Sequence, residues 1–202
     1  HRGAMSSERV DIAVIGAGPA GAATAIQAAR SGADVVVFEK GAYGRDKVCG
    51  DGLTPRAVGA LHELKIDLAD AHHIRGLRMI AGTQVRELDW PTTDRFPNHG
   101  AVWPRRRLDA ALMDAAMGAG AEIRFETAAT PVLDDDGRVS GVDASGRRID
   151  ADLTVVAAGA PGQVARLLGA DRVTDEPFGL AIRTYAASPR HDSVHLEACL
   201  SL

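Results

Sequence analysis

One stretch near the start of the chain decides the fold, and it reads VDIAVIGAGPAGAATAIQAARSGADVVVFEK over residues 10–40. Residues 10–15 form a short, mostly apolar run bounded by glycine, which is typical of a buried parallel strand. The alanine-rich residues 20–29 predict a helix with Gly32 at its C-terminal end, and residues 35–38 predict a second buried strand. A strand, a glycine turn, a helix and a strand in this order make one βαβ unit, for which a right-handed crossover is the rule.

The turn of this unit carries three glycines, Gly16, Gly18 and Gly21, in the pattern G-x-G-x-x-G. The first glycine of this pattern permits a tight turn, the second leaves room for a pyrophosphate, and the third lets the helix pack closely on the strand. The N-terminus of the helix adds N–H groups that favour an anion. Glu39 follows the second strand, where its carboxylate can accept hydrogen bonds from adenosine ribose hydroxyls and would repel a 2′-phosphate. The spacing therefore predicts a dinucleotide site.

A second cluster of chemically capable residues reads RDKVCGDGLTPR over residues 45–56. Glycines on both sides of Cys49 and Asp51 favour a backbone that lies close to a flat ligand. The thiol of Cys49 has two interpretations at this point, a functional group or a small buried hydrophobic side chain.

Composition and charge exclude several classes of protein. The chain has 202 residues, of which 46% are hydrophobic and 25% charged, as expected of a globular protein with a buried core. Its 23 Lys and Arg against 27 Asp and Glu give a formal net charge of −4, so no nucleic-acid partner is expected. Two cysteines, Cys49 and Cys199, cannot build a disulfide framework, which favours a reducing compartment and a cytoplasmic location.

The rest of the chain alternates between predicted helices and strands. Apolar spacing predicts helices over 53–64 and 108–117, and a further helix is expected near 163–168. Extended segments are expected at 77–80, at 84–90, within 122–152 with turns at Asp136-Gly137 and Ser145-Gly146, at 153–158 as a separate buried strand, and at 178–187 and 193–202.

No metal site is expected from the histidines. His72 and His73 are predicted at a helix end or in a solvated loop. His191 and His195 are predicted to share one face of a strand, but no third ligand stands near them in the sequence.

The glycine motif and the stretch KVCGDGLTPRA at 47–57 together resemble the geranylgeranyl reductase family of flavoproteins. The resemblance runs from Arg9 to the end of the chain and is greatest to the actinobacterial branch, which hydrogenates the isoprenoid tail of menaquinone. It implies FAD as cofactor, NAD(P)H as a candidate electron donor, and the α/β, Rossmann-type FAD-binding fold of p-hydroxybenzoate hydroxylase with an interleaved β-rich substrate domain. The expected domains are 6–67 with 101–176 for FAD, and 68–100 with 177–202 for substrate.

The resemblance also implies site residues. Arg105 stands three residues before Leu-Asp, as does the family's arginine that contacts the flavin chain, and backbone near Ala129 is expected against the adenine. Gly159 would approach the pyrophosphate, although Ala158 replaces the aspartate found in many relatives. The full set expected to bind cofactor is Gly16, Gly18, Pro19, Ala20, Gly21, Glu39, Lys40, Cys49, Gly50, Asp51, Arg105, Ala129 and Gly159, and Cys49 is the candidate catalytic residue.

The predicted function is saturation of an isoprenoid C=C bond in a menaquinone side chain or a geranylgeranyl group. A lipophilic isoprenoid substrate and peripheral association with the inner face of the cell membrane follow from this expectation. One alternative is an aromatic monooxygenase that uses FAD and NADPH. The other is a catalytically incomplete FAD-binding fragment, because the family's later Gly-Asp and Tyr-x-Trp-x-Phe-Pro-like motifs do not occur before Leu202. The chain is accordingly expected to be truncated at its C-terminus.

Overall fold

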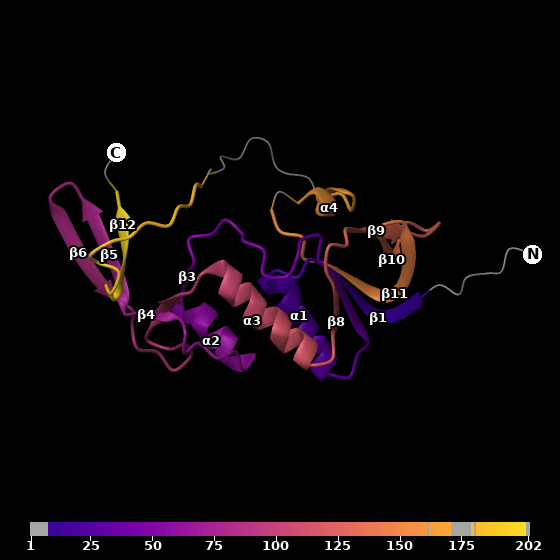
Figure 1. The fold of residues 1–202 in the computed structure, drawn as a ribbon, viewed down its shortest axis with the longest axis horizontal. Helices are drawn as coiled ribbons and strands as arrows, with labels where there is room; N and C mark the ends of the chain where they lie inside the picture. The colour runs from indigo at the N-terminus through magenta and orange to yellow at the C-terminus, as the bar shows by residue number, and fades with distance from the viewer. Residues whose placement is uncertain (1–7, 161, 171–178, 180, 201–202) are drawn as a thin grey trace, which may run out of the picture. The chain divides into compact units, whose positions relative to one another are not determined.

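The computed structural model describes residues 8–160, 162–170, 179 and 181–200 (Figure 1). The chain divides into two compact units. The first comprises His1–Arg45 and Leu108–Gly179, and the second comprises Asp46–Arg107 and Leu180–Leu202. Residues 46–67, which the sequence predicts as part of the FAD-binding domain, pack with the second unit. The functional division into cofactor and substrate domains stays a prediction.

The first unit is built on a six-stranded mixed sheet with the strand order β8-β2-β1-β11-β10-β9. The strands β8, β2, β1 and β11 run parallel to one another, whereas β10 runs antiparallel to both β11 and β9. Their bounds are β1 Glu8–Ile15, β2 Val35–Phe38, β8 Glu122–Arg124, β9 Ala129–Leu133, β10 Val139–Ala144 and β11 Arg147–Val156. This arrangement confirms the predicted α/β class and brings the carboxyl ends of the parallel strands to one edge.

Helix α1, Pro19–Arg30, connects β1 to β2 and completes the predicted βαβ unit. The helix buries small side chains, among them Ala22 and Ala25, which allow it to lie close to the sheet. Gly32 follows the last turn at a φ of +89°, a left-handed conformation that ends helices. All four residues of β2 are buried, as expected of a strand covered on both faces.

The predicted separate strand at 153–158 is wrong. Strand β11 runs without interruption from the second hairpin arm through Val156, because it pairs with β10 over its first half and with β1 over residues 149–156. Leu153 on this strand is 55% exposed, so the strand is not fully buried either. Helix α4, Gln163–Arg166, is shorter than predicted and continues as a turn.

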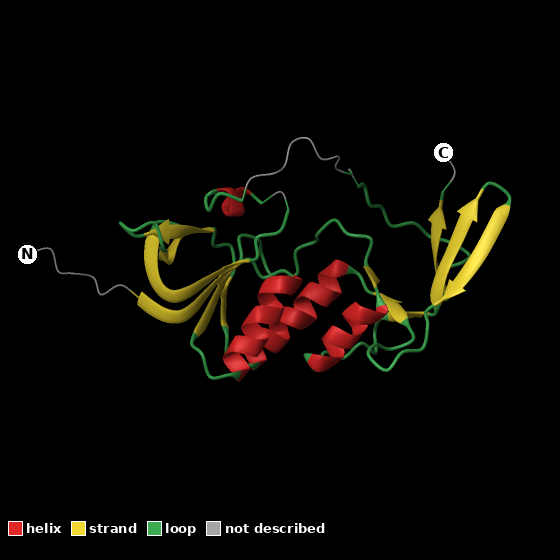
Figure 2. Cartoon of the chain, turned by 180° about the vertical axis from the view of Figure 1, so that it is seen from behind, coloured by secondary structure: helices red, strands yellow, loops and turns green. Residues whose placement is uncertain are grey.

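The second unit holds two three-stranded sheets, ordered β3-β7-β4 and β12-β5-β6. Figure 2 draws the strands of these sheets in yellow. Helix α2, Pro55–Glu63, lies within this unit, and α3, Arg105–Gly118, begins in it and continues into the first unit. The strand bounds are β3 Gly52–Leu53, β4 His72–Ile74, β5 Gly76–Ala81, β6 Gln84–Asp89, β7 Gly100–Val102 and β12 His195–Cys199.

Three predictions for the second unit are corrected. His72 and His73 lie on β4, which pairs with β7. Because β7 is distant in sequence, the local pattern around the two histidines does not reveal this pairing. His191 lies in a turn, so it does not share a strand with His195. The strand predicted at 178–187 does not form at residues 179 and 181–187, and its positions 178 and 180 lie outside the described residues.

Candidate functional site: a dinucleotide cradle

The glycine turn lies between β1 and α1, at the carboxyl edge of the parallel strands. Gly16 has a φ of +103°, and a Cβ atom there would lie 2.5 Å from the carbonyl oxygen of Ala157. A Cβ atom on Gly21 would lie 1.8 Å from the carbonyl oxygen of Gly16. Both positions therefore require glycine, one for the turn and one for the close approach of helix and strand.

The turn is open at Gly18. Gly18 is the N-cap of α1 and supplies no side-chain cap, and a Cβ atom there would have Arg45 Nη2 as its nearest neighbour, 4.0 Å away. Pro19 occupies the first helical position, where its missing N–H costs nothing. The N–H groups of Ala20 and Gly21 fall in the first turn, which has no intrahelical acceptors for them. This backbone fits a phosphate.

Glu39 lies directly after β2 with only 3% of its surface exposed. Its Oε2 accepts a hydrogen bond from the Ala17 N–H at 3.0 Å, and its Oε1 accepts one from the Gly41 N–H at 2.8 Å. Burial by itself would raise the pKa of Glu39, but the hydrogen bonds from Arg45, Gly41 and Ala17 outweigh it and hold the pKa below its ordinary value. The carboxylate is therefore fixed and ionised beside the glycine turn.

Two charged residues of the cradle were not predicted from the sequence. Arg45 donates from Nε to Glu39 Oε1 at 3.0 Å and from Nη2 to Oε2 at 3.1 Å, a two-pronged contact. Its Nη1 lies 3.7 Å from Oδ2 of Asp109, a buried residue of α3. The only signal in the sequence was an arginine six residues after Glu39 within a glycine-rich loop.

Among the other predicted site residues of the first unit, the structure brings the segment before Gly159 beside the glycine turn. The Ala157 N–H donates to the Ile15 carbonyl at 2.8 Å, which brings the segment that leads to Gly159 beside the glycine turn. Gly159 itself is exposed, with a φ of +72°. Ala129 begins β9 and is buried, whereas the Lys40 side chain is exposed.

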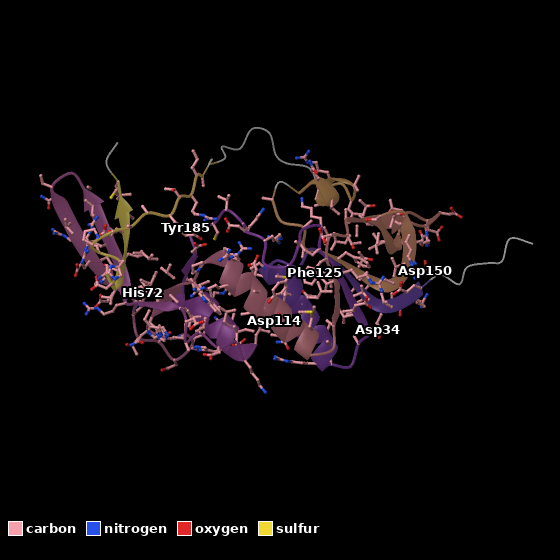
Figure 3. All side chains as sticks on the ribbon, in the orientation of Figure 1. Asp34, His72, Asp114, Phe125, Asp150 and Tyr185 are labelled. Atoms are coloured by element: carbon pink, nitrogen blue, oxygen red, sulfur yellow. The ribbon has the colours of Figure 1, made fainter. Side chains whose placement is uncertain are left out.

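The remaining predicted site residues belong to the second unit, where Asp51 is the centre of a small network. Asp51 is 5% exposed and has a φ of +60°. Its Oδ1 accepts the Arg105 N–H at 3.1 Å, at the start of α3, and its Oδ2 accepts the Tyr185 hydroxyl at 2.6 Å. Tyr185 lies on the irregular segment that the strand prediction misread (Figure 3), and its hydrogen bond to Asp51 raises its pKa. Cys49 is a half-buried free thiol, and Gly50 is exposed.

This network yields a first prediction. We expect Asp51→Ala to destabilise the second unit by about 2–4 kcal/mol, because alanine is strained at positive φ and the half-buried N–H of Arg105 loses this acceptor. Asp51→Asn tolerates this backbone and keeps an amide oxygen, so its loss should stay within about 1 kcal/mol. Denaturation followed by tryptophan fluorescence measures both, since Trp90 and Trp103 lie in this unit. Equal losses in the two variants would contradict this explanation.

Among the residues that the structure places, no three His, Cys, Asp or Glu side chains gather in a way that could hold a metal ion. Within the described part of the chain, no helix has the length and apolar character needed to cross a lipid bilayer.

A βαβ unit with a G-x-G-x-x-G turn and a buried acid after its second strand defines a dinucleotide-binding α/β domain. Comparison with known families agrees with this class. The family described as FAD binding domain matches residues 9–195, so the chain belongs to that family.

The curated relatives carry names from isoprenoid chemistry. The chain is 39% identical over 199 residues to a menaquinone reductase of Mycobacterium tuberculosis, covering 96% of this chain and 48% of the relative. It is 34% identical over 176 residues to digeranylgeranylglycerophospholipid reductase 1 of Methanothermobacter thermautotrophicus, covering 82% of this chain and 43% of the relative. The chain thus spans about half the length of the curated relatives it matches.

Solved structures share the fold. A flavoprotein/dehydrogenase of Cytophaga hutchinsonii superposes with a TM-score of 0.70 at 26% identity, covering 84% of this chain and 44% of that one. A geranylgeranyl bacteriochlorophyll reductase-like protein of Thermoplasma acidophilum superposes with a TM-score of 0.66 at 26% identity, covering 81% and 42%. Both comparisons agree with the predicted flavoprotein fold.

Proposed function

We propose that the cradle of the first unit binds the adenosine and pyrophosphate half of FAD. The open side of Gly18 and the uncapped N-terminus of α1 support a pyrophosphate there, with Pro19 and Ala20 in the same turn. The buried Glu39 supports recognition of the ribose. Gly16 and Gly21 shape the turn, and Lys40, Ala129 and Gly159 are proposed as further cofactor contacts. In the second unit the proposed contacts toward the flavin ring are Cys49, Gly50, Asp51 and Arg105, and these rest on the family resemblance.

The protein that contains this chain is proposed to be an FAD-dependent reductase of isoprenoid C=C bonds. The observation that carries this proposal is the 39% identity to menaquinone reductase over 96% of the chain. Bound FAD in its reduced form would supply a hydride to one alkene carbon. A proton must be added to the other alkene carbon, so that the double bond gains two hydrogen atoms. Cys49 is proposed to assist this proton transfer. NAD(P)H is proposed as the reductant that returns two electrons to the cofactor.

The proposed substrate is a lipophilic isoprenoid, in a menaquinone side chain or a geranylgeranyl group. The names of the relatives support this substrate class. Because such a tail dissolves in a bilayer, peripheral association with the membrane surface belongs to the same proposal. Flotation with vesicles that contain menaquinone tests it, and protein that stays at the bottom of the gradient would remove it.

The experiment for the proposed function has two stages. The purified chain is expected to show a flavin absorption band or to acquire one on incubation with FAD, and FAD is expected to be released on heating. A form of the protein as long as its relatives is then reduced without oxygen and given menaquinone, and mass spectrometry is expected to find one saturated tail bond. Oxygen consumption with NADPH and an aromatic substrate, with no saturated product, would instead support a monooxygenase.

Cys49 is tested in the same assay. We expect Cys49→Ala to slow saturation of the tail by roughly 100-fold, the usual contribution of a positioned proton donor. The assay is run with saturating FAD, and the FAD content of both proteins is measured, so that a slower reaction is not explained by loss of the cofactor. Wild-type turnover in the Cys49→Ala protein would exclude the thiol from the reaction. Cys199→Ala is the matched control, because Cys199 is an exposed free thiol on β12.

A further inference from the structure

The carboxylate of Glu39 has no unfilled hydrogen-bonding position. A carboxylate offers about four lone-pair sites, and four donors fill them. Two are the backbone N–H groups of Ala17 and Gly41, at 3.0 and 2.8 Å. The other two are Nε and Nη2 of Arg45, at 3.0 and 3.1 Å. A ribose with two neighbouring hydroxyls can therefore bind Glu39 only if two of these donors leave.

The two donors that can leave belong to Arg45. The backbone N–H groups are fixed by the glycine turn and by the chain after β2, whereas the Arg45 side chain is 25% exposed and the Glu39 side chain only 4%. The loop also makes room for the arginine, because a Cβ atom on Gly41 would lie 2.5 Å from Arg45 Cδ. The guanidinium group of Arg45 thus occupies the hydrogen-bonding positions on Glu39 that the two ribose hydroxyls would need.

A destination for the released guanidinium lies close to its present position. Arg45 Nη2 is the nearest atom to the open side of Gly18, at 4.0 Å from where a Cβ would stand. That side of the turn is where the uncapped N-terminus of α1 favours a pyrophosphate. A pyrophosphate there would add negative charge beside Glu39 and near the buried Asp109, and a nearby arginine would offset it.

We propose that Arg45 exchanges partners when a nucleotide binds. It pairs with Glu39 in the free protein, yields that carboxylate to the ribose hydroxyls, and turns to the pyrophosphate. Arg45 then acts as a specificity-determining residue that favours adenine nucleotides with a pyrophosphate over the bare nucleoside. A nucleoside has no phosphate, so it must break the Arg45–Glu39 ion pair without offering the arginine a new anionic partner. Its binding is therefore less favourable. This inference rests on the proposed FAD site and concerns how that site chooses its ligand.

The test compares two probes, adenosine and ADP, on the wild type and on Arg45→Met, which keeps a long side chain without charge or donors. ADP affinity is expected to fall at least about tenfold in the variant. Adenosine affinity is expected to stay unchanged or to rise, since its competitor is gone. An equal loss for both probes, or an unchanged affinity for ADP, would overturn the proposal. Arg148→Met is the matched control, because Arg148 pairs with Asp150 on β11 and should affect neither probe.

A second measurement uses the wild-type protein and does not depend on the folding of the methionine variant. The NMR signal of the Arg45 Nε–H group is assigned by its disappearance in Arg45→Lys. Its chemical shift is expected to change when adenosine binds, and to move to a different position when ADP binds. A signal that stays unmoved by both ligands would overturn the exchange. If the wild type binds neither ADP nor FAD, the proposed cofactor site fails and the inference falls with it. Binding of both with no change in selectivity in Arg45→Met overturns the inference alone.

Discussion

A protein with alanine in place of Gly21 is expected to lose FAD binding and about 3 kcal/mol or more of its folding free energy. The added Cβ would stand 1.8 Å from the carbonyl oxygen of Gly16 and 3.2 Å from Val14 Cγ1, and the first of these is a backbone atom that cannot rotate away. Helix α1 must then move off β1, which displaces the first-turn N–H groups that are proposed to hold the pyrophosphate. One methyl group therefore acts on both stability and ligand binding.

Thermal unfolding and FAD titration measure these two effects. Gly118→Ala is the matched control, because Gly118 ends α3 with φ in the ordinary region and nothing within 4 Å of its would-be Cβ. Alanine in a helix is favoured over glycine, so this control should be neutral or more stable by up to about 1 kcal/mol. A Gly21→Ala protein as stable as the control, with wild-type affinity for FAD, would show that the helix can shift without harm to the site.

The first unit could be predicted well because its decisive features are local in sequence. The βαβ unit lies within residues 10–40, where the two strands, the turn and the helix each have a recognisable sequence pattern. The hairpin turns near Gly137 and Ser145-Gly146 were equally local, and the structure places β9, β10 and β11 around them. The error at 153–158 arose because no turn residue separates the hairpin arm from the strand that pairs with β1.

The second unit was harder to predict because its short strands exist only through distant partners. Strand β7 pairs with both β3 and β4, so His72 and His73 are extended although nothing beside them in sequence requires it. The segment 181–187 shows the reverse case. Its apolar pattern favours a strand, yet Tyr185 reaches Asp51 and Arg183 reaches Asp46 at 2.5 Å, while no neighbouring strand pairs with the segment in the described residues.

The sequence could not reveal the residues that contact Glu39 or its partner through their side chains, Arg45 and Asp109. Glu39 and the three glycines have assigned places in a known spacing, and the structure gathers them at one edge of the sheet. Arg45 and Asp109 have no such spacing. Their relation to Glu39 depends on how the loop after β2 folds back, which brings Arg45 to Asp109 on α3 across the sequence.

Glu39→Gln is expected to destabilise the protein by roughly 2–3 kcal/mol at neutral pH and to weaken the acid dependence of its stability. This loss of unfolding free energy follows from breaking a buried ion pair. It is smaller than the usual value of about 3–5 kcal/mol because the Arg45 side chain is a quarter exposed. The pKa of Glu39 is lower in the folded protein than its ordinary value of 4.5. Its stabilising contribution is therefore complete above that value and disappears as the pH falls through the lowered pKa.

The difference in unfolding free energy between wild type and Glu39→Gln should accordingly be constant from pH 7 to about pH 5 and shrink at lower pH. Urea unfolding followed by circular dichroism at each pH measures it. Glu122→Gln is the matched control, since Glu122 pairs with Arg124 at the surface with 58% of its side chain exposed and should change stability by less than about 1 kcal/mol. A difference that stays constant down to pH 3 would mean that Glu39 is not held ionised by Arg45. The carboxylate that the cradle is proposed to offer to the ribose would then lack its structural basis.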